Sequence, residues 1–147
     1  MRTLLVAVIT LPSVLFAQQT PPHNPCDERP VSQLQMSRCA DFESQQADAH
    51  LSHVYQRAMQ YLADDSAKAQ ASNDQAQIEY EKNATNSLEQ SQQVWLSYRD
   101  IQCKAAGQQY QGGSMAPMIF SQCMKTLTNQ RIYALKSIYE DGDQKLE

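Results

Sequence analysis

The chain has 147 residues, a length that suits one small domain. Its 12 basic and 16 acidic side chains give a net charge of −4, which argues against a nucleic-acid ligand because such a ligand requires clustered lysine and arginine. An acidic surface suits a basic protein partner and serves solubility equally well, so charge alone does not identify a function.

The first 17 residues have the layout of a secretory signal peptide. Arg2 supplies a short basic start, residues 4–16 form an apolar run, and Ala17 precedes a polar stretch. The apolar run is short for a membrane span, so a retained anchor is the less favoured alternative. Cleavage after Ala17 removes one positive charge, leaves a net charge of −5, and predicts an exported protein with no membrane attachment.

A proline-rich, polar leader and then a helix follow the signal segment. Residues 18–31 are expected to be extended, and Ser32 with Gln35 three residues later gives the pattern of a capping box. The apolar positions of this helix recur every three or four residues to about residue 62, except for one turn at Glu43 that has no apolar member. They are Met36, Ala40, Ala47, Leu51, Val54, Ala58 and Leu62.

The next segment, residues 63–77, has few apolar side chains but is rich in alanine and glutamine, which favour helix. Either the first helix continues through it or a turn interrupts it, and we expect a turn at residues 72–74. A second helix ends near Gly107, which suits a C-terminal cap. It carries Ile78, Leu88, Trp95, Tyr98 and Gln102.

A connector with three glycines, residues 107–114, leads to a third helix. Ser114 is expected to cap this helix, Pro117 to lie in its first turn, and Gly142 to end it. Its stripe is Met118, Phe120, Met124, Leu127, Arg131, Leu135 and Ile138. No stretch alternates with the period of a strand, so the predicted fold is all-α: a three-helix antiparallel bundle over residues 32–140, with a tail at residues 141–147.

Two disulfides are expected to staple this bundle. An even number of cysteines in an oxidising compartment predicts disulfides, and four cysteines allow three pairings. The helical hairpin favours the local pairing, Cys26 with Cys39 and Cys103 with Cys123. A zinc site is the competing interpretation, and the lack of a C-x-x-C pattern disfavours it.

A set of spaced residues extends over residues 26–135 of the chain. It comprises Met36-x-x-Cys39, Ala47-Asp48-x-x-Leu51-x-x-x-Tyr55, Gln92-x-x-Trp95-x-x-Tyr98-Arg99-Asp100-x-x-Cys103, Tyr110-x-Gly112-Gly113-Ser114, Cys123 and Thr128-x-x-Arg131-x-x-x-Leu135. In this order the set resembles the LprI-type lysozyme-inhibitor family of small secreted bacterial proteins. The chain departs from the family at Ser52, where asparagine is usual, and in its longer segment between residues 62 and 88. The resemblance implies lysozyme inhibition, an activity that belongs to few members.

Candidate catalytic and metal-binding residues are few. His50 and His53 stand at i and i+3 of the first helix and form half of a metal site, but Asp48 points elsewhere, so two exposed histidines are the favoured interpretation. Gly112, Gly113 and Ser114 lack the lysine and spacing of a phosphate-binding loop, which favours a tight turn. We therefore expect no enzyme, no cofactor and no bound metal.

Two arginines are expected to be partly buried and to need partners. Arg99 and Arg131 both flank apolar stripes, where an unpaired charge is costly. We predict that Asp48 contacts one or both of them and ties the three helices together in a structural ion network.

The predicted function is that of a non-enzymatic binding protein, and the resemblance makes lysozyme the first partner to consider. Tyr110 on the connector is the residue most expected to touch a protein partner. The other candidates are Tyr98, Arg99, Asp100, Gly112, Gly113 and Ser114. Two alternatives stay open: an envelope module that binds another periplasmic protein or peptide, and a metal-binding protein or enzyme that uses His50 and His53. The sequence does not predict the oligomeric state.

Overall fold

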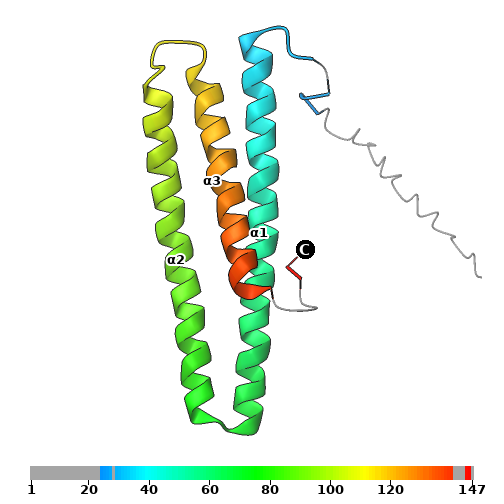
Figure 1. Cartoon of the computed structure of the whole chain (residues 1–147), viewed down its shortest axis with the longest axis vertical. Helices are drawn as coiled ribbons and strands as arrows, with labels where there is room; N and C mark the ends of the chain where they lie inside the picture. Colours follow the sequence, from blue (N-terminus) through cyan, green and yellow to red (C-terminus); the bar gives the residue numbers. More distant parts are fainter. Residues whose placement is uncertain (1–23, 28, 141–144, 147) are drawn as a thin grey trace, which may run out of the picture.

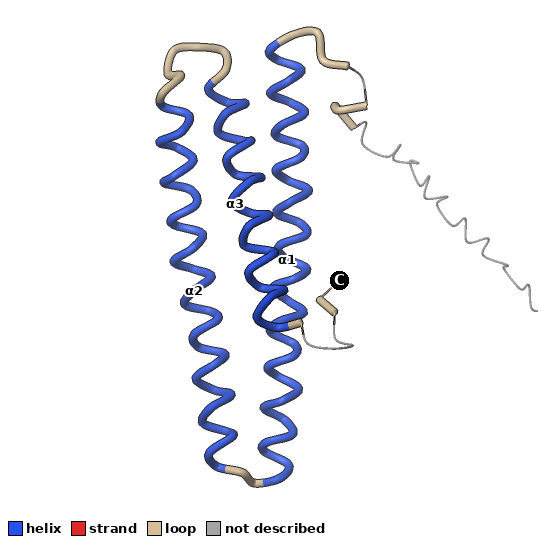
Figure 2. The backbone as a smooth tube through the Cα atoms, in the orientation of Figure 1, coloured by secondary structure: helices blue, strands red, loops and turns tan. Residues whose placement is uncertain are grey.

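The computed structural model describes residues 24–27, 29–140 and 145–146, so the predicted signal peptide and much of the leader lie outside the described residues. Three antiparallel helices dominate the fold: α1 (Gln33–Ser72), α2 (Gln75–Gln108) and α3 (Ala116–Tyr139) (Figure 1). Figure 2 shows the helices joined by a short turn and one loop, with no strand in the described part of the chain. The predicted all-α, three-helix architecture is confirmed.

Side-chain caps define where α1 begins and where α2 begins. The Ser32 hydroxyl oxygen accepts a hydrogen bond from the Gln35 backbone N–H at 3.3 Å. After α1, Asn73 takes a left-handed backbone conformation with φ 54°, and the Asp74 carboxylate accepts a backbone N–H in the first turn of α2. The turn predicted at residues 72–74 is confirmed, and the first helix continues through the alanine- and glutamine-rich segment to reach it.

One apolar core lies where the three helices meet. Its buried members come from all three helices and from the tail: Leu51, Val54, Ala58, Leu62, Leu88, Ile132, Leu135 and Leu146. Tyr98 and Ile138 continue the predicted stripes but are 51% and 65% exposed, because a 3.6-residue period drifts out of register along a long helix. None of the described helices is both long and apolar enough to span a membrane.

The helices differ in length, and this shapes the two ends of the bundle. α1 has 40 residues and α2 has 34, whereas α3 has only 24, so the α1–α2 hairpin projects beyond the end of α3 (Figure 1). Glu81, near the projecting end, is buried, and its carboxylate accepts a hydrogen bond from Gln77 Nε2 at 2.6 Å. Tyr80 beside it is 65% exposed.

Two disulfides link neighbouring elements at the opposite end. Cys26 is bonded to Cys39 and Cys103 to Cys123, with Cα–Cα distances of 4.9 and 5.4 Å, so the predicted local pairing is confirmed. All four cysteines are therefore engaged in disulfides and are not zinc ligands. Each link is worth about 3 kcal/mol in the chain-entropy model.

The start of α3 differs from the prediction. The N-cap position is Met115 rather than Ser114, and no side chain caps the helix. Pro117 lies in the first turn as predicted, and because proline has no N–H it leaves one fewer backbone donor to satisfy there. α3 ends at Tyr139, before Gly142, which lies outside the described residues.

Gly107 also has a different role from the predicted C-terminal cap. α2 continues past it to Gln108, and Gly107 itself is buried. A Cβ at this position would lie 3.4 Å from the Ala116 carbonyl oxygen and 3.6 Å from Cβ of Phe120. Gly107 therefore lets the start of α3 pack closely against the end of α2.

Candidate functional site

The connection between α2 and α3, residues 109–115, is here called the corner. Its backbone groups bond within the corner and to the end of α2: the Tyr110 N–H donates to the Gly107 carbonyl at 3.0 Å, and the Gly113 N–H donates to the Tyr110 carbonyl at 2.9 Å. Because these backbone groups are already paired, the corner keeps its shape without help from a partner.

The two adjacent glycines make the tightest part of the corner. Gly112 has φ +83°, in the left-handed region that glycine enters without steric cost. A Cβ on Gly113 would come 3.2 Å from the Tyr110 carbonyl oxygen, closer than an ordinary contact. The Cys103–Cys123 disulfide joins the two helices that lead into and out of this turn, so the corner is held from both sides.

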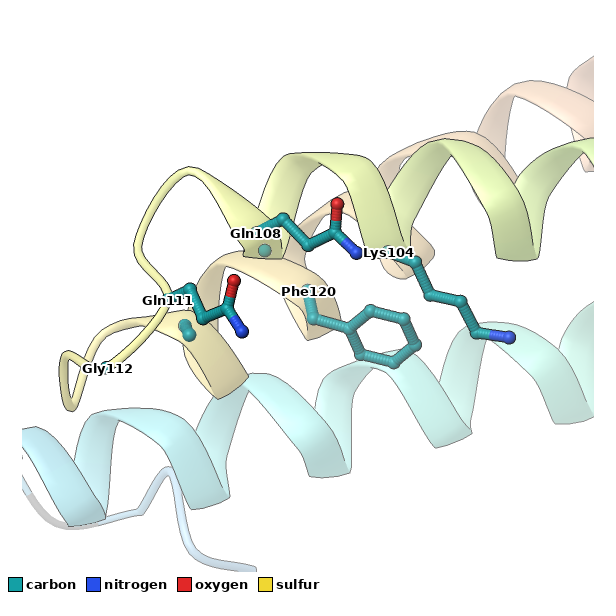
Figure 3. A pocket seen from close by; sticks show the side chains of 7 residues that line it. Lys104, Gln108, Gln111, Gly112 and Phe120 are labelled. Carbon is teal, nitrogen blue, oxygen red and sulfur yellow. The ribbon is translucent and has the colours of Figure 1, made fainter.

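A shallow hollow of about 360 Å³ lies beside the corner. Figure 3 shows the side-chain amides of Gln108 and Gln111 and the ammonium of Lys104 around the Phe120 ring. Gly107, Gly112 and Ala116 complete the lining. An aromatic surface surrounded by amides and one cation offers stacking, hydrogen bonds and a positive charge to a ligand.

The corner is almost uncharged in an otherwise acidic protein. Lys104 is the only charged side chain between Asp100 and Lys125. Tyr110 is 41% exposed, and Ser114 is exposed as well. The corner therefore presents hydroxyl and amide groups, and Lys104 of α2 adds a single positive charge beside it.

A separate polar cluster ties the three helices together in mid-bundle. Arg99 of α2 donates from Nη1 to Asp48 Oδ1 of α1 at 2.6 Å and to the Thr128 hydroxyl of α3 at 3.0 Å. Thr128 in turn donates to the same Asp48 oxygen at 3.1 Å. Asp100 Oδ1 accepts from Nε and Nη2 of Arg99, both at 3.3 Å. The structure thus brings Asp48 and Arg99 together as predicted. With Thr128, the cluster has one member from each of the three helices.

Arg131 does not join this cluster. Its Nε donates to the Gln92 side-chain oxygen at 2.9 Å and its Nη2 to the Ser91 hydroxyl at 2.9 Å. Burial lowers the pKa of the Arg131 guanidinium. Both arginines lie over the Trp95 ring, with the Arg99 and Arg131 carbons 5.1 and 5.9 Å from its centroid. Trp95 therefore packs as a structural aromatic between two cations.

The residues proposed for partner binding fall into two places. Tyr110, Gly112, Gly113 and Ser114 are together in the corner. Tyr98, Arg99 and Asp100 lie farther back on α2; the Arg99 side chain is only 8% exposed and is engaged by Asp48, Asp100 and Thr128. Of this second group, Arg99 is buried, whereas Tyr98 is 51% exposed.

The sequence did not predict the two residues that accept hydrogen bonds from the arginines, Thr128 for Arg99 and Gln92 for Arg131. Thr128 is fully buried and Gln92 is 8% exposed, although both are polar. A usable signal was present: each stands on the inward side of its helix, where a buried hydroxyl or amide must find a hydrogen-bond partner.

A second hollow of about 280 Å³ lies next to the mid-bundle cluster. It is lined by Asp48, Leu51, Ser52, Tyr55, Gln92, Leu96 and Arg99. Burial, reinforced by the nearby Glu89 carboxylate, raises the pKa of Tyr55 above its ordinary value. The charged groups in its lining, Asp48 and Arg99, are already paired with each other.

His50 and His53 are both exposed on α1. Within the described residues, the one group of three potential ligand side chains is Cys26, Cys39 and Glu43, and its two sulfur atoms form a disulfide. No third ligand side chain in that part of the chain gathers with the two histidines.

Comparison with known proteins identifies a family and one relative for this chain. Residues 26–135 match the family described as "Lysozyme inhibitor LprI". An uncharacterized protein of Rhizobium meliloti (strain 1021) is 35% identical over 116 residues, which cover 77% of this chain and 78% of that protein. No solved structure matches. The matched region includes both disulfides, the mid-bundle cluster and the corner, and the chain belongs to the LprI lysozyme inhibitor family.

Proposed function

We propose that this chain is a secreted or periplasmic, non-enzymatic binding protein that inhibits a lysozyme through its corner. The observation that carries the proposal is a preformed, exposed turn beside an aromatic hollow, held by the Cys103–Cys123 disulfide. Family membership supplies the class of partner.

The chemistry of the corner complements a glycosidase cleft. Such clefts cleave sugar chains with a pair of carboxyl groups, and they bind hydroxyl and amide groups of the glycan. Tyr110 and Ser114 offer hydroxyls, Gln108 and Gln111 offer amides, and all four are exposed. Lys104 brings a positive charge that suits the carboxylates of the cleft.

Charge acts over two distances in this proposal. The chain as a whole is acidic, and this favours encounter with a basic enzyme at long range. The corner itself holds no charged residue, and the nearby Lys104 of α2 is a cation, so neither places a negative charge against an acidic cleft. Overall attraction and local fit therefore support each other.

The stiffness of the corner supports tight binding. A loop that already has its bound shape loses little conformational entropy on association. Here the positive φ of Gly112, the hydrogen bond from Gly113 to Tyr110 and the nearby disulfide all restrict the free loop. All four cysteines are in disulfides, so none of them can act as a nucleophile.

The test measures cleavage of peptidoglycan by a purified lysozyme in the presence of the processed chain. We expect inhibition, weakened at least about tenfold by Tyr110→Ala, as for loss of a central aromatic at an interface. Tyr80→Ala is the matched control, because Tyr80 is an exposed tyrosine near the start of α2, at the opposite end of that helix from the corner. Full lysozyme activity at a large molar excess of the processed chain contradicts the proposal.

Lys104 provides a second pair of variants. Lys104→Gln is expected to slow association and to make it less dependent on salt, because a rim charge acts mainly on the encounter rate. Lys82→Gln changes another exposed lysine of α2, far along the helix from the corner, and is expected to have no such local effect. Stopped-flow or surface-based kinetics at two salt concentrations separates the two variants.

A further inference from the structure

One long face of the molecule, formed by α2 and α3 together, is made of thirteen positions that hold no acidic or basic residue. Helical spacing of three, four and seven residues places its members on one side of each helix. On α2 they are Ser87, Ser91, Val94, Tyr98, Ile101, Gln102 and Ala105. On α3 they are Ile119, Gln122, Thr126, Gln130, Tyr133 and Ser137. We call this the neutral face.

The absence of charge at these positions is unusual for a protein surface. Acidic and basic residues commonly make up 25–35% of a surface, so about three or four are expected among thirteen positions of this kind. Lys125 of α3 pairs with Glu43 of α1 at 3.0 Å, away from these positions, whereas Arg131 reaches only the edge of the face, where its Nη2 donates to the Ser91 hydroxyl at 2.9 Å. Depletion of charge with exposed tyrosine is the composition of an interface centre.

The neutral face also exposes large apolar side chains. Val94 is 69% exposed, Ile101 is 68% exposed and Tyr133 is 76% exposed. Between the two helices the face is hollowed by a groove of about 370 Å³. The groove is lined by Tyr98, Gln102, Ile119, Gln122, Cys123, Thr126 and Leu127. A face with both ridges and a groove can interlock with another helical surface.

We propose that a second copy of this chain covers the neutral face, so that the protein is a two-fold symmetric dimer. Each copy carries a net charge of −5 after removal of the signal segment, so two copies repel one another. Contact through an uncharged face brings the fewest like charges together. In a two-fold dimer the same patch meets itself, which an uncharged face permits at no electrostatic cost. A basic enzyme, by contrast, is attracted by acidic surfaces and gains no such attraction here.

The available area fits this assignment. Four large side chains of the neutral face are well exposed: Val94, Tyr98, Ile101 and Tyr133. If a large side chain has roughly 150–250 Å² of surface, their exposed parts amount to on the order of 400 Å² per copy. A standard interface buries about 800 Å² per partner. The exposed glutamines, serines and threonine of the neutral face supply the remainder as a polar rim.

The dimer goes beyond the proposed inhibition and does not depend on it. The corner lies at one end of the bundle (Figure 1), whereas the neutral face covers residues 87–105 of α2 and 119–137 of α3. Dimerisation through the neutral face therefore leaves each corner accessible.

Light scattering and sedimentation equilibrium of the processed, oxidised chain, from about 1 to about 100 µM, test the proposal. We expect twice the monomer mass at the upper end. Val94→Glu and Ile101→Glu are each expected to raise the dimer dissociation constant at least about 100-fold, since each substitution places its charge twice in the buried patch. Both positions are exposed, so circular dichroism is expected to show unchanged helix content.

Leu34→Glu is the matched control, because Leu34 is 60% exposed on α1 and lies outside the neutral face. It is expected to leave the dimer intact. A wild-type chain that stays monomeric at about 100 µM overturns the proposal, and so does a dimer that Ile101→Glu does not weaken. A monomer that binds an apolar peptide at the neutral face overturns it as well. Lysozyme inhibition measured on the same variants reports separately on the proposed function.

Discussion

Replacing Asp48 by alanine removes the one α1 side chain that pairs with Arg99. The Arg99 side chain is only 8% exposed, so the loss leaves a largely buried charge with a weaker set of partners. Removing one member of a buried ion pair costs about 3–5 kcal/mol, whereas an exposed pair is worth about 1 kcal/mol or less. Asp48 is 44% exposed and Asp100 remains 3.3 Å from Arg99, so we expect a loss of about 2 kcal/mol in the free energy of unfolding.

Urea denaturation followed by circular dichroism, with both disulfides intact, measures this loss. Asp48→Asn keeps an oxygen acceptor for Arg99 and Thr128 and is expected to cost about half as much as Asp48→Ala. Asp64→Ala is the control, since exposed Asp64 bonds to Gln60 on the surface, and it is expected to stay within about 0.5 kcal/mol of the wild type.

A double-mutant cycle with Thr128→Val tests whether the cluster acts as a unit. Thr128 bonds to both Asp48 and Arg99, so the two substitutions are expected to be non-additive by about 0.5 kcal/mol or more. A free energy of unfolding for Asp48→Ala within about 0.5 kcal/mol of the wild-type value contradicts this prediction, because buried Arg99 would then not need its α1 partner.

Three further predictions concern the covalent link, the corner and pH. Replacing Cys103 and Cys123 together by serine is expected to lower stability by about 3 kcal/mol, measured as a lower urea midpoint beside the oxidised wild type. Gly112→Ala places a Cβ at φ +83° and is expected to cost about 1 kcal/mol and to weaken inhibition; an unchanged melting temperature contradicts this. Burial raises the pKa of Tyr55 and Tyr139 above the ordinary value of 10.0, so their contribution to stability is present below pH 10 and is lost as pH rises through the folded-state pKa values. Ultraviolet titration and urea midpoints between pH 8 and pH 12 check the direction, and replacing both tyrosines by phenylalanine is expected to flatten the slope.

Local signals in the sequence were sufficient for much of the fold. The Ser32–Gln35 cap, the turn before Asp74 and the two local disulfides each depend on residues close together in the chain. Such signals reflect backbone geometry that neighbouring side chains decide, so they can be interpreted without a tertiary structure.

Contacts between distant segments were harder to predict. The Asp48–Arg99 pair followed from the cost of a buried charge, but the choice of Thr128 over Arg131 as the third member depends on helix rotation that periodicity does not fix. The role of Gly107 was missed because a glycine near a helix end suits both a cap and a close approach of two helices. The packing of Leu146 into the core also required the tertiary structure, since a lone leucine in a tail carries no periodic signal.

The position of the two disulfides makes the two ends of the bundle unequal in stability. Both bonds cross-link the end that carries the corner, while the projecting α1–α2 tip is held by non-covalent contacts alone among the described residues. Thermal fraying therefore starts at the tip and progresses toward the cross-linked end, where opening is blocked. Partial unfolding of this molecule is therefore expected to reach the corner last.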